Sequence, residues 1–182
     1  SDKLCQQNTE HALDTALPAN ESERLASLHN SQVLNEAWLS RYQEQIQQAR
    51  SAFDTAYAQI SWVDADWVYT PASTLLPLDA QTAQAGLPRA HTVCQYLVQQ
   101  NSALVIEDTL RDPRFADQQE FDHQKVRFYA GVPLRDEDGM VLGSLCVMDN
   151  KPRDISAEDL DLLQDMADDL MQTLQTKNKQ PD

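Results

Sequence analysis

The sequence predicts an α+β fold, in which helices cover both faces of an antiparallel sheet. Residues 126–134 and 140–148 are apolar or aromatic, and the turn cluster between them ends in Asp138-Gly139, a strong signal for a β-hairpin. Both alternating faces of residues 140–148 are largely apolar, which is typical of a strand covered on both sides. Segments with helical periodicity lie toward both ends of the chain and can supply the covering layers.

The N-terminal part predicts two helices after a polar and weakly ordered segment, residues 1–17. Asn20 with Glu23 three residues later is typical of a capping box that begins the first helix, and Leu25 and Leu28 give this helix its apolar face. A second helix is predicted over residues 35–53, where apolar residues recur at three- and four-residue steps: Trp38, Leu39, Tyr42, Ile46, Ala49 and Phe53.

Three further strands are predicted, over residues 57–63, 67–70 and 103–108. The first two flank a short turn and should pair, with Ala58, Ile60 and Trp62 on one face of the first strand.

The connections are less regular. Residues 71–90 contain three prolines and Gly86, so a long irregular segment is expected there, followed by a helix over 91–100. Asp112-Pro113 is typical of a helix start and predicts a short helix through Phe115. A polar connection, 117–125, leads into the hairpin.

The last predicted helix begins at a second capping box, Ser156 with Asp159, and continues to about residue 175. Its apolar residues step by three and four and form a seam of two heptads: Leu160, Leu163, Ala167, Leu170 and Leu174. Such a seam must pack on the sheet, on a second copy of the chain, or on both.

Length and charge restrict the class of protein. A chain of 182 residues is expected to form one domain, and 29 acidic against 14 basic residues argue against nucleic acid or an anionic membrane surface as a partner. No apolar run reaches the length of a membrane span, and no secretory signal is recognised. Three dispersed cysteines indicate reduced thiols and a cytoplasmic location.

A series of short motifs follows in order along the chain. The motifs are Glu23-Arg-Leu25, Val63-Asp-Ala-Asp66, Pro88-Arg89 followed by Cys94, Val105-Ile-Glu-Asp108, Asp112-Pro-Arg-Phe115, Arg127-Phe-Tyr-Ala-Gly131, Pro133-Leu134, Gly143-Ser-Leu-Cys-Val147 with Asp149, and Pro152-Arg153. In this order they resemble the GAF domain, a small sensory module of bacterial signalling proteins. The resemblance covers roughly residues 18–175 and leaves 176–182 as a tail or a linker to a missing output domain.

The resemblance implies a six-stranded antiparallel sheet with helices on both faces. It also implies a cavity for a small molecule on one side of the sheet, closed by the irregular segments between the second strand and the hairpin. Domains of this kind are similar to the input modules of diguanylate cyclases and histidine kinases, and they often form homodimers through their first and last helices. The resemblance therefore implies a non-catalytic sensor that signals to an attached or neighbouring output domain. No cofactor is predicted.

The candidate ligand-binding residues are Cys94, Asp108, Arg114, Phe115, Arg127, Tyr129 and Cys146. The two arginines could bind a carboxylate or phosphate through paired hydrogen bonds, and Asp108 could accept a hydrogen bond from an amine. The alternative is structural. In that case the arginines neutralise aspartates near the strand ends, and the aromatic residues belong to the core.

Two further functions stay open at this stage. Cys94 could be a redox thiol or a chromophore attachment point, although Gln95 stands where bilin-binding relatives commonly have His. Cys94 and Cys146 could act together as in free methionine sulfoxide reductases, provided that they lie close to each other. The chain could also be a ligand-free dimerisation module. The four histidines have no spacing that predicts a metal site, and the signature of cyclic-nucleotide-binding GAF domains is missing.

Overall fold

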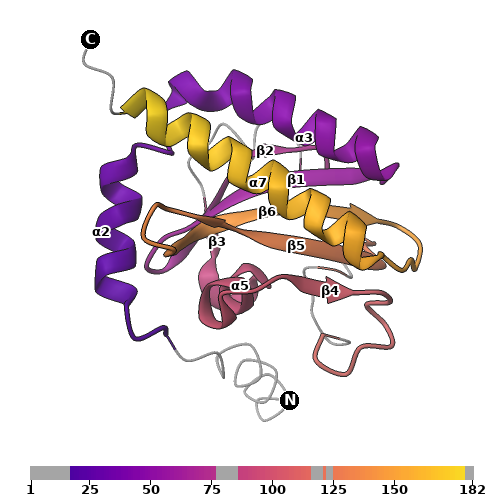
Figure 1. Ribbon diagram of the computed structural model, residues 1–182. Coiled ribbons are helices and arrows are strands. Elements are labelled where there is room, and N and C mark those ends of the chain that lie inside the picture. The colour runs from indigo at the N-terminus through magenta and orange to yellow at the C-terminus, as the bar shows by residue number, and fades with distance from the viewer. Residues whose placement is uncertain (1–16, 77–85, 116–120, 122–124, 179–182) are drawn as a thin grey trace.

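The computed structural model describes residues 17–76, 86–115, 121 and 125–178. Its six strands form one sheet in the order β3-β2-β1-β6-β5-β4, and every neighbouring pair is antiparallel (Figure 1). The predicted fold class is therefore confirmed. The strands are β1 (Tyr57–Val63), β2 (Trp67–Ser73), β3 (Leu87–Pro88), β4 (Leu104–Ile106), β5 (Phe128–Arg135) and β6 (Val141–Asp149).

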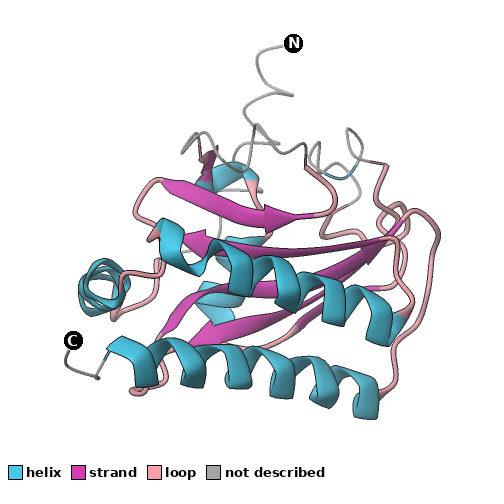
Figure 2. Ribbon diagram, turned by 90° about the horizontal axis from the view of Figure 1, so that it is seen from above, coloured by secondary structure: helices cyan, strands magenta, loops and turns pink. Residues whose placement is uncertain are grey.

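Helices cover both faces of this sheet. The two long helices, α3 (Leu39–Phe53) and α7 (Ala157–Asn178), lie side by side on one face (Figure 2). The short helix α5 (Cys94–Gln100) packs on the opposite face, against β6 and β1. Helix α2 (Glu21–Ser31) stands beside the end of the sheet near the β5–β6 turn and contacts both β6 and α7. Two short 3₁₀ helices, η1 (Glu36–Trp38) and η2 (Arg89–His91), precede α3 and α5.

The predicted hairpin forms the centre of the sheet. Strand β6 lies between β1 and β5, and all nine of its residues are buried. In the turn, the Asp136 carboxylate accepts hydrogen bonds from the backbone N–H groups of Asp138 and Met140, at 2.9 and 2.8 Å. Gly139 has a φ of +84°, a conformation that glycine adopts at little cost.

A bulge in β6 reverses two side chains relative to strict alternation. Leu134 pairs with Gly143 but Arg135 pairs with Val141, so Leu142 has no partner residue on β5. As a result Leu142 faces the α3–α7 side and Val141 faces the α5 side, together with Cys94. The face assignments that simple alternation predicts are wrong for these two residues.

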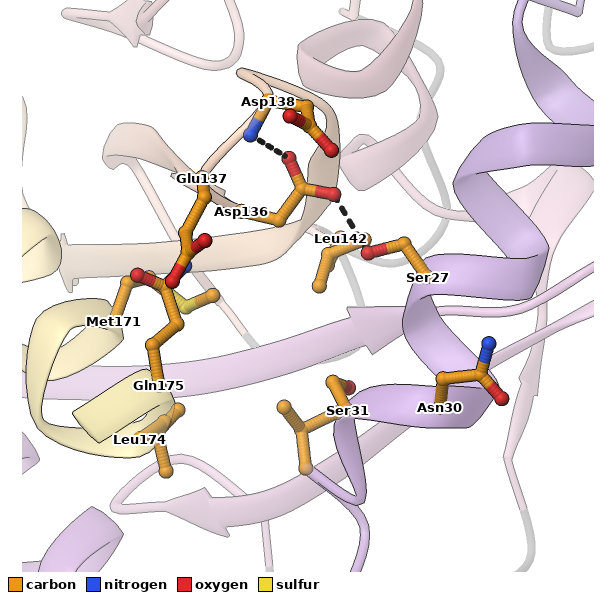
Figure 3. A pocket seen from close by; sticks show the side chains of 11 residues that line it. Ser27, Asn30, Ser31, Asp136, Glu137, Asp138, Leu142, Met171, Leu174 and Gln175 are labelled. Atoms are coloured by element: carbon orange, nitrogen blue, oxygen red, sulfur yellow. Dashed lines mark hydrogen bonds between the residues drawn. The ribbon is translucent and has the colours of Figure 1, made fainter. Parts of the chain in front are cut away.

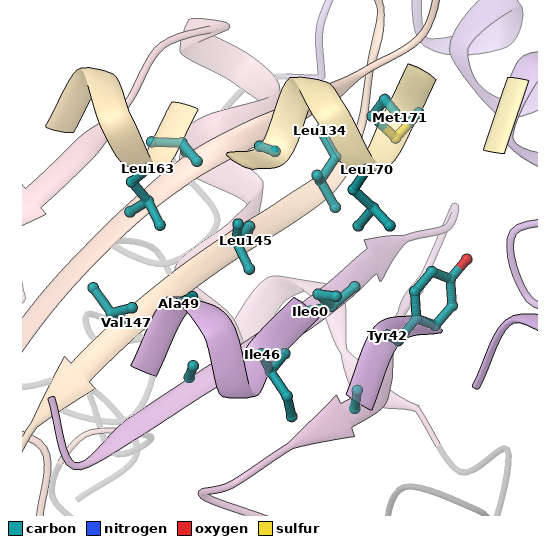
Figure 4. Packing of buried hydrophobic residues seen from close by; sticks show 14 of the residues in the cluster. Tyr42, Ile46, Ala49, Ile60, Leu134, Leu145, Val147, Leu163, Leu170 and Met171 are labelled. Carbon is teal, nitrogen blue, oxygen red and sulfur yellow. The ribbon is translucent and has the colours of Figure 1, made fainter. Parts of the chain in front are cut away.

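The larger core lies between the sheet and the two long helices (Figure 4). Leu163, Ala167 and Leu170 of the predicted heptad seam are fully buried there, beside Ile46, Ala49 and the β-strand residues Ile60 and Leu145. The seam thus packs on the chain's own sheet.

Other predictions were wrong at the ends of elements. The Asn20 side chain makes no capping hydrogen bond to α2, and residues 111–115 form turns where a short helix was expected. Strand β2 continues past Thr70 because a bulge accommodates Pro71, which has no N–H to donate. The edge strand β3 lies in the segment predicted to be irregular. By contrast, Ser156 caps α7 as expected and accepts a hydrogen bond from the Asp159 N–H at 3.1 Å.

Candidate functional site

The candidate ligand residues lie on or beside the α5 face of the sheet. Cys94 begins α5, and Cys146 and Tyr129 project from β6 and β5 into the apolar clusters beneath that helix. Asp108 and Arg114 belong to the turns that follow β4, and Arg127 immediately precedes β5. The fold brings these residues to one side of the molecule but divides them into separate groups.

Asp108 and Arg127 form the first group. The Asp108 Oδ1 atom accepts hydrogen bonds from Nη2 and Nε of Arg127, at 3.0 and 3.3 Å. Burial of Asp108 acts to raise its pKa, but the hydrogen bonds from Arg127 and from the Leu110 N–H outweigh that effect and lower the pKa. The adjacent Thr109 binds the backbone on both sides of this arginine, with its N–H donating to the Arg127 carbonyl and its hydroxyl to the Val126 carbonyl. This pair fastens the turn after β4 to the start of β5.

Asp112 and Arg114 form the second group, which is more exposed. Nη2 and Nε of Arg114 donate to the two carboxylate oxygens of Asp112 at 2.7 and 3.0 Å, and the Arg114 N–H donates to the same carboxylate. The hydrogen bonds from Arg114 lower the pKa of Asp112 and in turn raise that of Arg114. The Arg114 guanidinium also lies 5.1 Å from the centre of the Phe115 ring. Both predicted arginines are therefore engaged with aspartates of the chain itself.

The predicted aromatic residues belong to a buried cluster beneath α5. The Phe115 ring packs edge-on against the rings of Tyr96 and Phe121, with ring centres 5.0 and 6.4 Å apart. The ring centres of Phe121 and Tyr129 are 5.9 Å apart. Val93, Leu97 and Ile106 complete the surroundings of these rings. These described side chains fill space between α5 and the sheet. The segments expected to close a cavity there, 77–85 and most of 116–124, lie outside the described residues.

The two buried cysteines occupy separate environments. The Cys94 Sγ atom lies 3.6 Å from the Ser144 hydroxyl, whereas the Cys146 thiol donates to the Gln59 carbonyl at 3.7 Å. Cys146 is two residues beyond Ser144, or about 7 Å along the strand. A thiol pair that exchanges disulfides needs direct contact between the sulfurs, so this arrangement does not favour a joint redox role.

Sequence reasoning missed a buried charge network at the end of the sheet. Arg24 of α2 is 1% exposed and donates to the carbonyls of Val63 and Val141, at 2.7 and 3.3 Å. Glu21 accepts from Arg24 and also from Arg89 of η2, which is itself buried and donates to the Asp64 carbonyl at 3.0 Å. Arg24, and not the half-buried Leu25, therefore shares the inner face of α2 with Leu28. The available signal was the three-residue spacing of Glu21 and Arg24 on a helix.

The Glu21 carboxylate should make the stability of the fold depend on pH in the acidic range. Burial alone would raise the pKa of Glu21, but hydrogen bonds from Arg24 and Arg89 lower it from 4.5 to about 2. A lowered pKa means that the stabilisation is complete above about pH 4.5 and is lost as the pH falls toward 2. We expect Glu21→Gln to reduce the free energy of unfolding by about 2 kcal/mol at pH 7. Denaturant titrations at pH 7 and pH 3 should show the difference between wild type and variant shrinking at pH 3, and an equal difference at both would contradict the assignment.

The described residues contain no group of three or more His, Cys, Asp or Glu side chains that could hold a metal ion. None of their helices combines the length and the apolar character needed to cross a membrane.

Similarity to a curated protein extends over most of the chain. The cyclic di-GMP phosphodiesterase PA2567 of Pseudomonas aeruginosa is 33% identical over 161 residues, which are 87% of this chain. The same match covers 26% of the phosphodiesterase, so the chain spans about a quarter of that relative's length.

Solved structures share the fold at low identity. The GAF domain of a phosphoenolpyruvate-protein phosphotransferase from Acinetobacter superposes with a TM-score of 0.63 at 17% identity, covering 91% of this chain and 93% of that one. A type II free methionine-R-sulfoxide reductase from Thermoplasma acidophilum gives 0.62 at 16% identity, over 78% and 94% of the two chains. The family model of the GAF domain matches residues 38–174. The chain belongs to the GAF domain family, whose members occur in signalling proteins.

Proposed function

We propose that this chain is a non-catalytic sensory domain of a bacterial signalling protein. In this proposal a small ligand binds on the α5 face of the sheet and regulates an attached or neighbouring output domain. The match to a quarter of a cyclic di-GMP phosphodiesterase supports such an arrangement and favours turnover of cyclic di-GMP as the regulated output. A cytoplasmic location stays a prediction.

The proposal rests on the contacts of Glu21, which we call the Glu21 bridge. They join α2 to η2 and so give a physical route from the α5 face to the terminal helices α2 and α7. Glu21 binds Arg24 within α2 and Arg89 in η2, which directly precedes α5. Helix α2 contacts α7 in turn. A ligand that moves α5 and η2 would therefore act on the terminal helices through one carboxylate and two arginines. Regulation requires that the ligand prefer one of two arrangements of these contacts.

Ligand binding is tested by thermal shift with nucleotides, amino acids and organic acids. We expect one class to raise the melting temperature. The rise should be reduced in Asp108→Asn combined with Arg127→Gln, because this ion pair fastens the turn after β4 to the start of β5 beside the α5 face. The matched control is Arg41→Gln with Asp169→Asn, which removes an ion pair between the two long helices on the opposite face. No shift with any class would instead support a ligand-free dimerisation module.

Transmission from the α5 face to α2 and α7 is tested separately, by hydrogen exchange. A ligand that passes the first test should change amide protection in α2 and α7 of the wild type. In Glu21→Gln the same ligand should still bind, but the change in α2 should disappear. A change in α2 that is equal in both proteins would reject the bridge as the route.

A thiol-based enzyme is the alternative function from another class. Because Cys94 and Cys146 lie in separate environments, we expect no turnover of free methionine sulfoxide or peroxide above background. Cys94→Ser should not alter either rate. Turnover that requires Cys94 would establish the enzyme instead.

A homodimer through the first and last helices stays a prediction. Its interface cannot use the Leu seam of α7, because that seam packs on the chain's own sheet. A second copy would meet the outer face of α7, which exposes Asp161, Asp165, Asp168 and Asp169.

A further inference from the structure

A cleft of about 370 Å³ lies away from the α5 face, between α2, the β5–β6 turn and the C-terminal part of α7 (Figure 3). Its walls come from three parts of the chain that are distant in sequence. It is lined by Ser27, Asn30, Ser31, Val33, Asp136, Glu137, Asp138, Leu142, Met171, Leu174 and Gln175.

The inner part of the cleft is apolar. Val33, Leu142, Met171 and Leu174 contribute side chains that are at most 4% exposed, all belonging to the larger core. The volume falls within the range of about 300–1,000 Å³ that is usual for small-molecule sites, at its lower end. The shape suits a compact ligand with an apolar body.

The rim of the cleft is acidic. Asp136, Glu137 and Asp138 line it from the turn, and among the described side chains that line the cleft there is no Lys, Arg or His. The Asp136 carboxylate is fixed in position, because the Ser27 hydroxyl donates to it at 2.6 Å from α2 while two turn N–H groups donate from the other side. The uncharged polar residues Asn30 and Ser31 stand on the opposite wall. A cation is therefore the charge that complements the rim.

We propose that this cleft binds a small organic cation, an amine or guanidinium group attached to an apolar ring or chain. The apolar body lies on Leu142, Met171 and Leu174, and the cationic group faces the carboxylates of the turn. Such a ligand touches α2 and α7 at once and so fixes how these two helices pack. The proposal concerns a second site and does not depend on ligand binding at the α5 face.

Tryptamine is the probe, with indole-3-propionate as its anionic counterpart. In ¹H–¹⁵N spectra of the full chain at low salt, we expect tryptamine to shift signals of Ser27, Asn30, Leu142 and Leu174, and indole-3-propionate to leave them unchanged. Equal shifts with both compounds would overturn the charge argument. Shifts confined to the α5 face would overturn the site.

Charge variants distinguish attraction by the carboxylates of the rim from attraction by the net negative charge of the whole chain. Glu137→Gln with Asp138→Asn should weaken tryptamine binding about fivefold, since each exposed ion pair contributes modestly. The control, Glu158→Gln with Asp161→Asn, removes the same charges from exposed positions about 15 Å or more along α7 from Met171 and should change the affinity less than twofold. Equal weakening in both would mean non-specific attraction and would reject the site.

Asn30→Trp tests the cleft without altering charge. Asn30 is an exposed residue of the wall, so the indole ring can fill the opening while the fold is kept. The spectrum of the variant without tryptamine reports that the fold is intact. Tryptamine should then cause no shifts at Leu142 or Leu174, and unchanged shifts there would overturn the proposal.

Discussion

Replacing Gly143 by alanine is expected to destabilise the protein by about 3 kcal/mol or more, the largest effect of any single methyl group that we predict. A Cβ at this position would lie 2.0 Å from the backbone oxygen of Ser61 and 2.8 Å from the Trp62 ring. Both contacts belong to β1, which pairs with β6 here. The carbonyl cannot rotate away as a side chain could, so the two central strands would have to separate next to the Leu142 bulge.

Gly139→Ala is the matched control for this prediction. It adds the same methyl group to the same hairpin, but nothing lies within 4 Å of the new Cβ. Only the positive φ of +84° opposes it, at a cost of about 1 kcal/mol. In urea denaturation, the unfolding midpoint of Gly143→Ala should be much lower than that of Gly139→Ala. Similar midpoints would mean that β1 and β6 can accommodate the added methyl group, which would contradict the structure.

The second large effect is expected for Leu163→Glu combined with Leu170→Glu, which should abolish folding. The sequence alone left open whether these leucines join two copies, in which case the variant would be a folded monomer. Both side chains are 0% exposed and lie in the core between α7 and the sheet. Each substitution removes about 2 kcal/mol of apolar burial and places a carboxylate where water cannot reach it. Together these costs exceed the few kcal/mol by which domains are stable.

Circular dichroism and sedimentation distinguish the two outcomes. We expect loss of the cooperative unfolding transition and an expanded or aggregated species. Leu162→Glu is the control, because Leu162 is 46% exposed on the same helix, and it should change stability by about 0.5 kcal/mol or less. A compact, folded monomer from the double variant would contradict the packing of α7 described here.

The sequence predicted those parts of the fold that are encoded locally. The β5–β6 hairpin and α7 have strong periodic patterns, an Asp-Gly turn and a Ser cap, and each was found close to its expected bounds. The Leu142 bulge was missed because the residues around it are apolar on both faces, so alternation cannot reveal the extra residue. The two-residue strand β3 was missed because only its pairing with β2 defines it.

The candidate site was predicted less completely, for a physical reason. The residue types at Asp108, Arg114 and Arg127 were recognisable, but their partners depend on the tertiary structure. Asp108 and Arg127 are 19 positions apart and meet only because β4 pairs with β5. Arg24 was missed because a helical arginine is usually solvated, whereas here four hydrogen-bonding contacts to Glu21, Val63 and Val141 allow its burial.

The position of Arg24 also bears on where the smallest independently folding unit begins. The family match starts at residue 38, after α2 has ended. A fragment cut at that point would lose the guanidinium that binds the carbonyls of Val63 and Val141, and would leave the buried Arg89 without its carboxylate. Expression of a fragment that keeps α2 should therefore yield folded protein where the shorter one does not. We therefore expect the autonomous domain of this chain to be longer than the region that the family model matches.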